Sequence, residues 1–273
     1  MALAVTTEQA RFRSLALRMH PALEALDPPL PDPRGPVHPS AGGRGKAPWL
    51  IRAGCDNRDA ISALYQHWQQ AFPQAGMPYW SVRCWTLLHW QPVFLAVAAV
   101  HGAGLVPPLT ALSQKLGSEG DYKGIVAGYY LPPRGWSRPS IGQAGAMLER
   151  LCQELLQQLN QVTAIKPLSA RRLVADTLLL ALCRLPLIST ALTTRQILAL
   201  SRQWLDATGL TQQSALVPVR LECGREALVL DRKGCCMDYR RQGGEICASC
   251  PRRKRPQRLQ LQMEELSRAT DTV

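Results

Sequence analysis

Apolar residues recur every three or four positions over most of the chain, and this spacing predicts a protein built mainly of helices. The clearest repeats of leucine cover residues 142–162 and 169–183. Comparable patterns predict helices at 7–26, 57–72 and 193–207. Each segment has an apolar face and a polar face, so we expect the helices to pack around a shared core.

Residues that favour helix caps precede two of these segments. Asp56 or Asn57 is the expected cap of the helix at 57–72, and Thr193 or Thr194 that of the helix at 193–207. Short polar side chains accept hydrogen bonds from the free N–H groups of a first helical turn. Gly209 is expected to end the second of these helices.

A long stretch without charge separates Arg83 from Lys115 and covers thirty-one positions. Its length is sufficient for a membrane span. Histidine, glutamine, proline and glycine interrupt it, however, and only residues 93–100 are continuously apolar. We therefore expect a buried central helix that ends near Pro107 and Pro108, and no membrane span.

Alternating apolar residues at 122–131 predict a strand. Two further β-prone segments, 216–222 and 226–231, flank Cys223-Gly224-Arg225 and predict a hairpin. The expected fold is therefore α+β and predominantly α-helical. Its small antiparallel sheet is expected to include this C-terminal hairpin, which leads the chain to Gly234.

The sequence suggests three regions. A mainly helical body is expected at 1–215, with a flexible linker rich in Pro and Gly at 27–48. The hairpin and a metal-binding segment follow at 216–251, and a basic tail with a short helix at 252–273. The apolar residues of that helix share one face: Leu259, Met263 and Leu266.

Positive charge is concentrated near the C-terminus. The chain has a formal net charge of +12, and residues 220–258 contribute +6 of it, from eleven Lys or Arg and five Asp or Glu. Such a field attracts an anionic partner. The first twenty residues lack the features of a secretory signal, so we expect a cytoplasmic protein, with peripheral contact to the inner face of the membrane as a further expectation.

Four of the nine cysteines fall within sixteen positions: Cys235, Cys236, Cys247 and Cys250. In a reducing compartment, clustered cysteines more often bind metal than form disulfides. Glycines at 234, 243 and 244 let the backbone bend around such a site. The other cysteines are expected to be small buried hydrophobic residues: Cys55, Cys84, Cys152, Cys183 and Cys223.

The spacing of the four cysteines bears on the kind of metal. Zinc modules usually draw their ligands from two CxxC or CxxxC turns, whereas here only Cys247 and Cys250 form one. Adjacent side chains in an extended backbone point to opposite sides, so Cys235 and Cys236 need a turn, which Gly234 favours. A two-iron cluster takes two thiolates on each iron and tolerates this wider placement. Which cysteines share an iron stays open.

The pattern CCx10CxxC behind a hairpin resembles the FhuF-type ferric-siderophore reductases. The likeness is sharpest over residues 217–251, including the run Cys-Cys-Met-Asp-Tyr-Arg from Cys235 to Arg240. It is weaker elsewhere, where it rests on an apolar helix ending in Gly-Leu-Val-Pro-Pro-Leu at 104–109. Members of the family tend to end soon after the last cysteine, whereas this chain continues, so the resemblance implies no role for the tail.

The resemblance implies a [2Fe–2S] cluster held by the four clustered cysteines, with no catalytic residue beyond it. It further implies that one electron passes to iron(III) in a siderophore of hydroxamate type, releasing iron(II) in the cytoplasm. Hard oxygen ligands favour iron(III), so reduction weakens the complex. The implied partners are the ferric siderophore and an electron donor such as a ferredoxin or a flavoprotein.

Basic residues flank the cysteines and are candidates for docking an anionic substrate or an acidic donor: Arg232, Lys233, Arg240 and Arg241. The alternative is that they form an ordinary solvated face.

Three other functions compete with the reductase. The run from Arg252 to Arg255 is typical of a zinc-bearing protein that binds nucleic acid, although we expect no nucleic-acid partner. A peripheral membrane or partner-docking protein would use the tail helix, with purely structural cysteines. A redox sensor with a Cys235–Cys236 disulfide would leave Cys247 and Cys250 unexplained.

Overall fold

The computed structural model describes most of the chain, namely residues 12–20, 23–25, 49–118, 125–130, 137–189 and 192–270. The predicted linker at 27–48 lies outside these ranges. So do the first five residues of the helix predicted at 7–26 and the first three of the strand predicted at 122–131.

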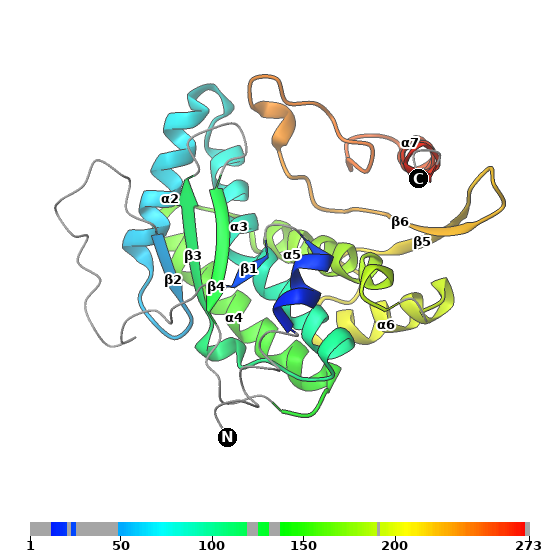
Figure 1. Ribbon diagram of the computed structural model, residues 1–273. Coiled ribbons are helices and arrows are strands. Elements are labelled where there is room, and N and C mark those ends of the chain that lie inside the picture. Colours follow the sequence, from blue (N-terminus) through cyan, green and yellow to red (C-terminus); the bar gives the residue numbers. More distant parts are fainter. Residues whose placement is uncertain are drawn as a thin grey trace.

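Five of the described helices form most of the body of the molecule, and Figure 1 shows how they pack together. They are α2 (Arg58–Ala71), α3 (Met77–Ala98), α4 (Ile141–Val162), α5 (Pro167–Cys183) and α6 (Thr194–Ala207). Short turns of 3₁₀ helix cover Pro73–Ala75, Leu109–Ala111, Leu185–Leu187 and Asp238–Arg240. Apolar side chains of all five helices belong to one core. The predicted body of packed helices is thus confirmed, with ends that differ by a few residues.

Helix α3 is the predicted buried central helix. It is buried around most of its circumference and packs against α2, α4 and α5. The five residues Ala99–Ala103 continue it as a π-helix, and Gly104 follows in the left-handed conformation, with φ of 70°. None of the helices within the described ranges has the length and apolar character needed to cross a membrane.

A four-stranded sheet, in the order β1-β4-β3-β2, lies against the helices. Its strands are β1 (Glu24–Ala25), β2 (Trp49–Arg52), β3 (Ser113–Ser118) and β4 (Ile125–Tyr130). Strand β1 is parallel to β4, whereas the other pairs are antiparallel. The sheet is therefore mixed, whereas an antiparallel sheet was predicted. Only β4 was expected. The others are two to six residues long and lack a clear apolar alternation, so periodicity did not identify them.

The C-terminal hairpin is confirmed. Strands β5 (Leu216–Arg220) and β6 (Glu226–Leu230) pair antiparallel and form a separate two-stranded sheet. Gly224 adopts φ of 81° in the connecting turn, a conformation that glycine takes without strain. The mainly helical α+β fold, with a hairpin ahead of the cysteines, is therefore as predicted.

The first predicted helix is shorter than its apolar pattern suggested. Residues 12–19 are helical, with Phe12, Ala16 and Met19 buried, but the helix does not reach residue 26. Pro21 disfavours helical conformation in the residue before it. The chain instead turns and places residues 24 and 25 in β1.

Of the two predicted helix caps, one forms a capping hydrogen bond and the other does not. Thr193 caps α6 through a reciprocal capping box with Gln196. Asn57 stands at the cap position of α2, but its side chain makes no capping bond. Its amide instead bonds the backbone of Arg52 in β2 and the carbonyl of Cys55. Burial of Asn57 explains this, because its polar atoms need nearby partners.

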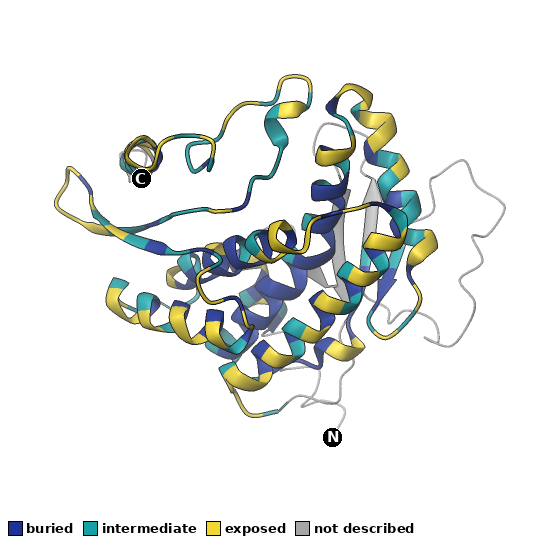
Figure 2. Cartoon of the chain, turned by 180° about the vertical axis from the view of Figure 1, so that it is seen from behind, coloured by how far each residue is buried: buried dark blue, intermediate teal, exposed yellow. Residues whose placement is uncertain are grey.

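Beyond the hairpin the chain runs outside the body and ends in helix α7 (Arg255–Thr270), beside β6 (Figure 1). Figure 2 shows that this C-terminal part is mostly exposed or half-buried, whereas the body has a buried interior. The predicted tail helix exists, and Leu259, Met263 and Leu266 are each half-buried. Among the side chains described in this helix, however, the two most buried are the polar Arg258 and Gln262.

Candidate metal centre

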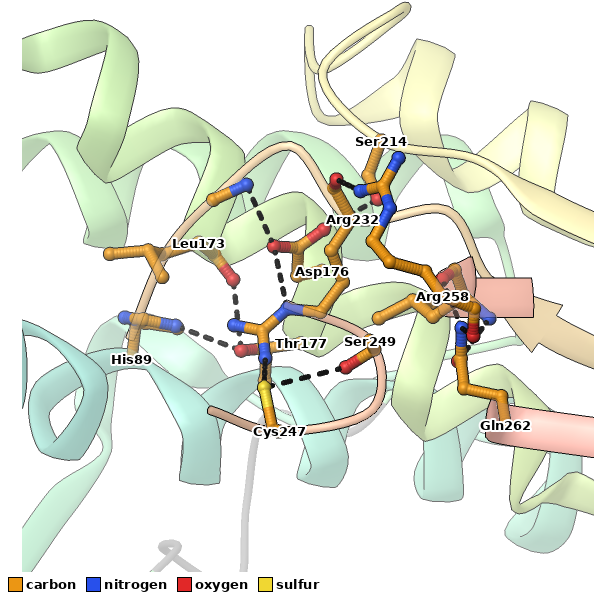
Figure 3. A network of polar contacts seen from close by, with 12 residues as sticks. His89, Leu173, Asp176, Thr177, Ser214, Arg232, Cys247, Ser249, Arg258 and Gln262 are labelled. Carbon is orange, nitrogen blue, oxygen red and sulfur yellow. Dashed lines mark hydrogen bonds and ion pairs between the residues drawn. The ribbon is translucent and has the colours of Figure 1, made fainter. Parts of the chain in front are cut away.

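A buried carboxylate, that of Asp176 in α5, ties the start of the cysteine segment to the body. Asp176 accepts hydrogen bonds from Ser214 Oγ at 2.5 Å, from Arg232 Nε at 3.2 Å and from Gly234 N at 3.2 Å (Figure 3). Two of these donors stand just before Cys235 in the chain. Asp176 therefore fixes the start of the cysteine segment against α5.

Gly234 is required by this close approach. A Cβ at this position would lie 2.9 Å from Asp176 Oδ2 and 3.2 Å from the backbone nitrogen of Leu173. Sequence reasoning gave Gly234 a different role, that of the turn which redirects the two adjacent cysteines. The left-handed residue is instead Met237, with φ of 59°, directly after Cys236. The turn is therefore present, but on the other side of the cysteine pair.

The four cysteine side chains face one another in two pairs. Cys236 and Cys247 shift each other's pKa, as do Cys235 and Cys250, so the two thiols of each pair lie close together. Cys250 is buried, whereas the other three are half-buried. The chain turns at the predicted CxxC, where Cys250 N donates to Cys247 O at 3.1 Å. Each of these two pairs therefore combines one of the adjacent cysteines, Cys235 or Cys236, with one cysteine of the CxxC turn.

The electrostatic surroundings favour a thiolate at Cys236. The hydrogen bond from Cys247 lowers the pKa of Cys236 to about 5, with further contributions from the backbone at Asp238 and from the charge of Arg232. Donating that same hydrogen bond raises the pKa of Cys247, and burial raises it further. Burial is the main cause that raises the pKa of Cys235. Only thiolates bind metal, so the lowered pKa of Cys236 favours its ligand form.

Arg232 points into this group of cysteines. Its Nη1 lies 4.0 Å from Cys247 Sγ, while its Nε bonds Asp176, and only 16% of its side chain is exposed. Ser249 Oγ lies 3.9 Å from the same sulfur. A positive charge and a hydroxyl therefore surround Cys247, an arrangement that stabilises negative charge on sulfur.

The other three predicted docking residues bind nearby parts of the protein. Lys233 Nζ donates to Gln212 O at 2.7 Å, and Arg240 Nε to Ala75 O at 2.8 Å. Arg241 Nε forms an ion pair with Asp238 at 2.8 Å. Lys233 and Arg240 remain largely exposed. Their docking role stays a prediction, and Arg232 is the member of the set that faces the cysteines.

The basic tail closes over the same segment. Arg255 and Arg258 of α7 both pair with Asp231, at 2.8 Å each, and Gln262 bonds both backbone groups of Leu230. Arg253 donates to the carbonyls of Ile246 and Cys247, and Arg252 lies over the ring of Tyr239, 4.7 Å from its centroid. Most of the tail's arginines thus bind the cysteine segment or the strand that leads to it.

Sequence reasoning missed the residues that hold this segment in place, namely Asp176, Ser214, Arg258 and Gln262. A signal existed for one of them. Asp176 is the only charged residue between Leu173 and Cys183. A lone carboxylate in such an apolar stretch is costly to bury without partners, so partners on another segment were to be expected.

The scattered cysteines mostly match the expectation. Cys84 and Cys152 are buried, and Cys55 and Cys183 are half-buried. Burial raises the pKa of Cys152 and of Cys183 to about 12, so both stay protonated. Cys223 contradicts the expectation, because the hairpin turn leaves it exposed.

The donor set suits a cluster of two irons. The four clustered cysteines match in number and type the four thiolates that a [2Fe–2S] cluster requires. Among the residues that the structure describes, no three or more His, Cys, Asp or Glu side chains are grouped as the ligands of one metal ion.

Comparison with known proteins identifies the class of this segment. It is a [2Fe–2S] domain, and its type is given by residues 232–252, which match the family described as FhuF 2Fe-2S C-terminal domain. The matched residues begin at Arg232 and include all four clustered cysteines. No solved structure matches the chain. The resemblance and the cofactor inferred from the cysteine spacing are thereby confirmed for this segment.

Proposed function

We propose that this protein is an iron–sulfur reductase that passes one electron to iron(III) held by a siderophore of hydroxamate type. The ligands of its [2Fe–2S] cluster are Cys235, Cys236, Cys247 and Cys250. One observation carries the proposal: the FhuF-type segment folds so that its cysteines face one another in two pairs. When bound, the cluster supplies one-electron transfer.

The substrate chemistry explains why one electron is sufficient. Hydroxamate oxygens are hard ligands that favour iron(III), so one added electron gives iron(II), which they hold less tightly. The electron comes from a donor such as a ferredoxin or a flavoprotein. Each 59 mV of driving force changes a one-electron equilibrium tenfold, so the potential of the centre selects the siderophores that are reduced.

The protein's own residues provide access and charge. Three of the four cysteines are half-buried, so the site lies near enough to the surface for a bulky complex to approach. Lys233 and Arg240 are exposed beside it and would attract an anionic substrate or an acidic donor. We place the reaction in the cytoplasm, with peripheral contact to the inner face of the membrane.

An electron-transfer assay tests this function. Anaerobically reduced protein is mixed with a ferric hydroxamate siderophore, and iron(II) is captured with a chromogenic chelator. We expect one iron(II) for each cluster oxidised. The same siderophore loaded with gallium(III), which accepts no electron, should leave the visible spectrum of the protein unchanged. Failure to oxidise the protein with any ferric hydroxamate would contradict the proposed reaction.

The zinc-bearing nucleic-acid-binding protein is the alternative. The basic run that suggested this alternative makes contacts within the chain: Arg255 pairs with Asp231, Arg253 donates to two carbonyls, and Arg252 contacts Tyr239. These contacts support the reductase, because they give the basic run a partner within the chain. One zinc per chain together with salt-dependent binding to DNA would favour the alternative.

A further inference from the structure

We propose that Asp176 is a positioning residue that holds the guanidinium of Arg232 against Cys247 and so raises the reduction potential of the [2Fe–2S] centre. The inference rests on the function proposed above, since it needs Cys247 to be a ligand. The inference goes beyond the proposed function because it assigns a role to Asp176, a residue of the helical body far outside the matched segment.

The guanidinium of Arg232 spans two groups. Nε bonds Asp176 Oδ2 at 3.2 Å, and Nη1 lies 4.0 Å from Cys247 Sγ (Figure 3). The carboxylate and the sulfur therefore meet different nitrogens of one rigid, planar group. Holding Nε fixes the direction of Nη1.

The backbone around Arg232 is fixed as well. Arg258 Nη1 donates to the carbonyl oxygen of Arg232 at 2.6 Å, and Gly234 N donates to Asp176. The side chain of Asp176 is itself held by Ser214. Arg232 is thus secured through its side chain by the body and through its backbone by the tail.

A purely stabilising ion pair explains this arrangement less well. Burying a carboxylate and a guanidinium costs desolvation that their attraction often only offsets, and apolar residues of similar volume serve stability as well. Asp176 is 4% exposed in its side chain and Arg232 is 16% exposed, so both have lost most of their hydration. What an apolar pair would not provide is a positive charge at the sulfur of Cys247.

The charge has a defined effect on electron affinity. Reduction adds one negative charge to the centre, and a nearby cation stabilises the reduced form more than the oxidised form. Hydrogen bonds to ligand sulfur act in the same direction. Arg232 in its observed position therefore raises the potential.

The Asp176→Asn variant separates positioning from simple charge. Removing a negative charge with nothing else changed would raise the potential. If Asp176 instead holds Arg232 in place, releasing the guanidinium lowers the potential, in spite of the lost negative charge. The two roles thus predict shifts of opposite sign.

The experiment is a redox titration with dithionite on anaerobically purified holoprotein, followed by electron paramagnetic resonance. We expect Arg232→Gln to lower the equilibrium constant for reduction about tenfold, or about 59 mV. Asp176→Asn should lower it at least threefold, and Arg232→Lys should lower it although the charge is kept. Asp176→Asn added to Arg232→Gln should produce no further fall.

Arg225→Gln is the matched control, because it removes the same charge from the exposed hairpin turn of the same region. We expect it to change the constant less than twofold. Ser214→Ala keeps all charges but removes one hydrogen bond to Asp176, so it should lower the equilibrium constant for reduction. This variant tests the proposal if Asp176→Asn fails to fold. A rise in potential in Asp176→Asn, or unchanged potentials in the Arg232 variants, overturns the positioning role alone. A preparation with no reducible cluster overturns the proposed function with it.

Discussion

Arg258 of the tail helix donates a hydrogen bond from Nη1 to the carbonyl oxygen of Arg232, at 2.6 Å. Its Nη2 bonds Asp231 at 2.8 Å, so one buried guanidinium binds two consecutive residues between the hairpin and the cysteines. The tail thus acts as a brace on the cysteine segment. This contact explains why the basic residue at this position lies inward.

Arg258→Ala is expected to destabilise the protein by about 2 kcal/mol, because it removes charged hydrogen bonds and leaves Asp231 with one partner fewer. Urea unfolding followed by circular dichroism measures the change. Lys254→Ala is the control, since that side chain is exposed. Equal losses in the two variants would contradict the bracing role.

Gly234→Ala should reduce both stability and iron content. The new Cβ would press on Asp176 Oδ2 and on the backbone of Leu173, and overpacking of this kind costs about 1 to 3 kcal/mol. Iron analysis and thermal unfolding measure the two effects. Gly142→Ala, in the first turn of α4, meets only Ser140 Oγ at 3.8 Å and should retain full iron content. A normal iron content in Gly234→Ala would refute the packing argument.

The stability of the protein should fall in mild acid because of His89. Burial lowers the pKa of His89 to about 4, below its ordinary value of 6.5. The stabilising neutral form is therefore fully present above pH 6.5, and stability is lost as the pH falls from 6.5 toward 4. From pH 7 to pH 5.5 we expect a loss on the order of 1 kcal/mol from this residue.

Urea unfolding at both pH values checks this expectation, with His89→Gln beside the unaltered protein. The variant lacks the titrating ring, so its stability should depend less on pH over this interval. The same dependence in both proteins would show that His89 does not contribute.

The cysteine set is tested by two matched variants. Cys236→Ser should abolish the reducible signal, because it removes one of the four proposed ligands, the one whose lowered pKa most favours a thiolate. Cys223→Ser changes an exposed cysteine of the hairpin turn and should leave the signal intact. Electron paramagnetic resonance of the reduced proteins compares them, and the reverse result would require a different ligand set.

The sequence predicts local features of this protein well, since they depend on neighbouring residues. Leucine spacing located α4 and α5, Thr193 marked the start of α6, and alternation located the hairpin. The cysteine spacing identified the type of the metal segment. In each case the physical cause lies within a window of about twenty residues.

Features that depend on distant partners were missed. Strand β2 exists because it pairs with β3, more than sixty positions away along the chain, and neither alternates clearly. The sequence made Arg232 a candidate for binding an external anion or a member of a solvated face, but Asp176 of α5 turns it inward. Likewise the apolar pattern of the tail gave no indication that Arg258 and Gln262 form its most buried face.

The [2Fe–2S] cluster is tested by the spectrum of anaerobically purified protein, recorded in the visible range and by electron paramagnetic resonance after reduction, with iron and sulfide analysis. We expect a coloured protein with two irons and two sulfides per chain and a signal from one unpaired electron. A colourless preparation that stays colourless after reconstitution with iron and sulfide would contradict it.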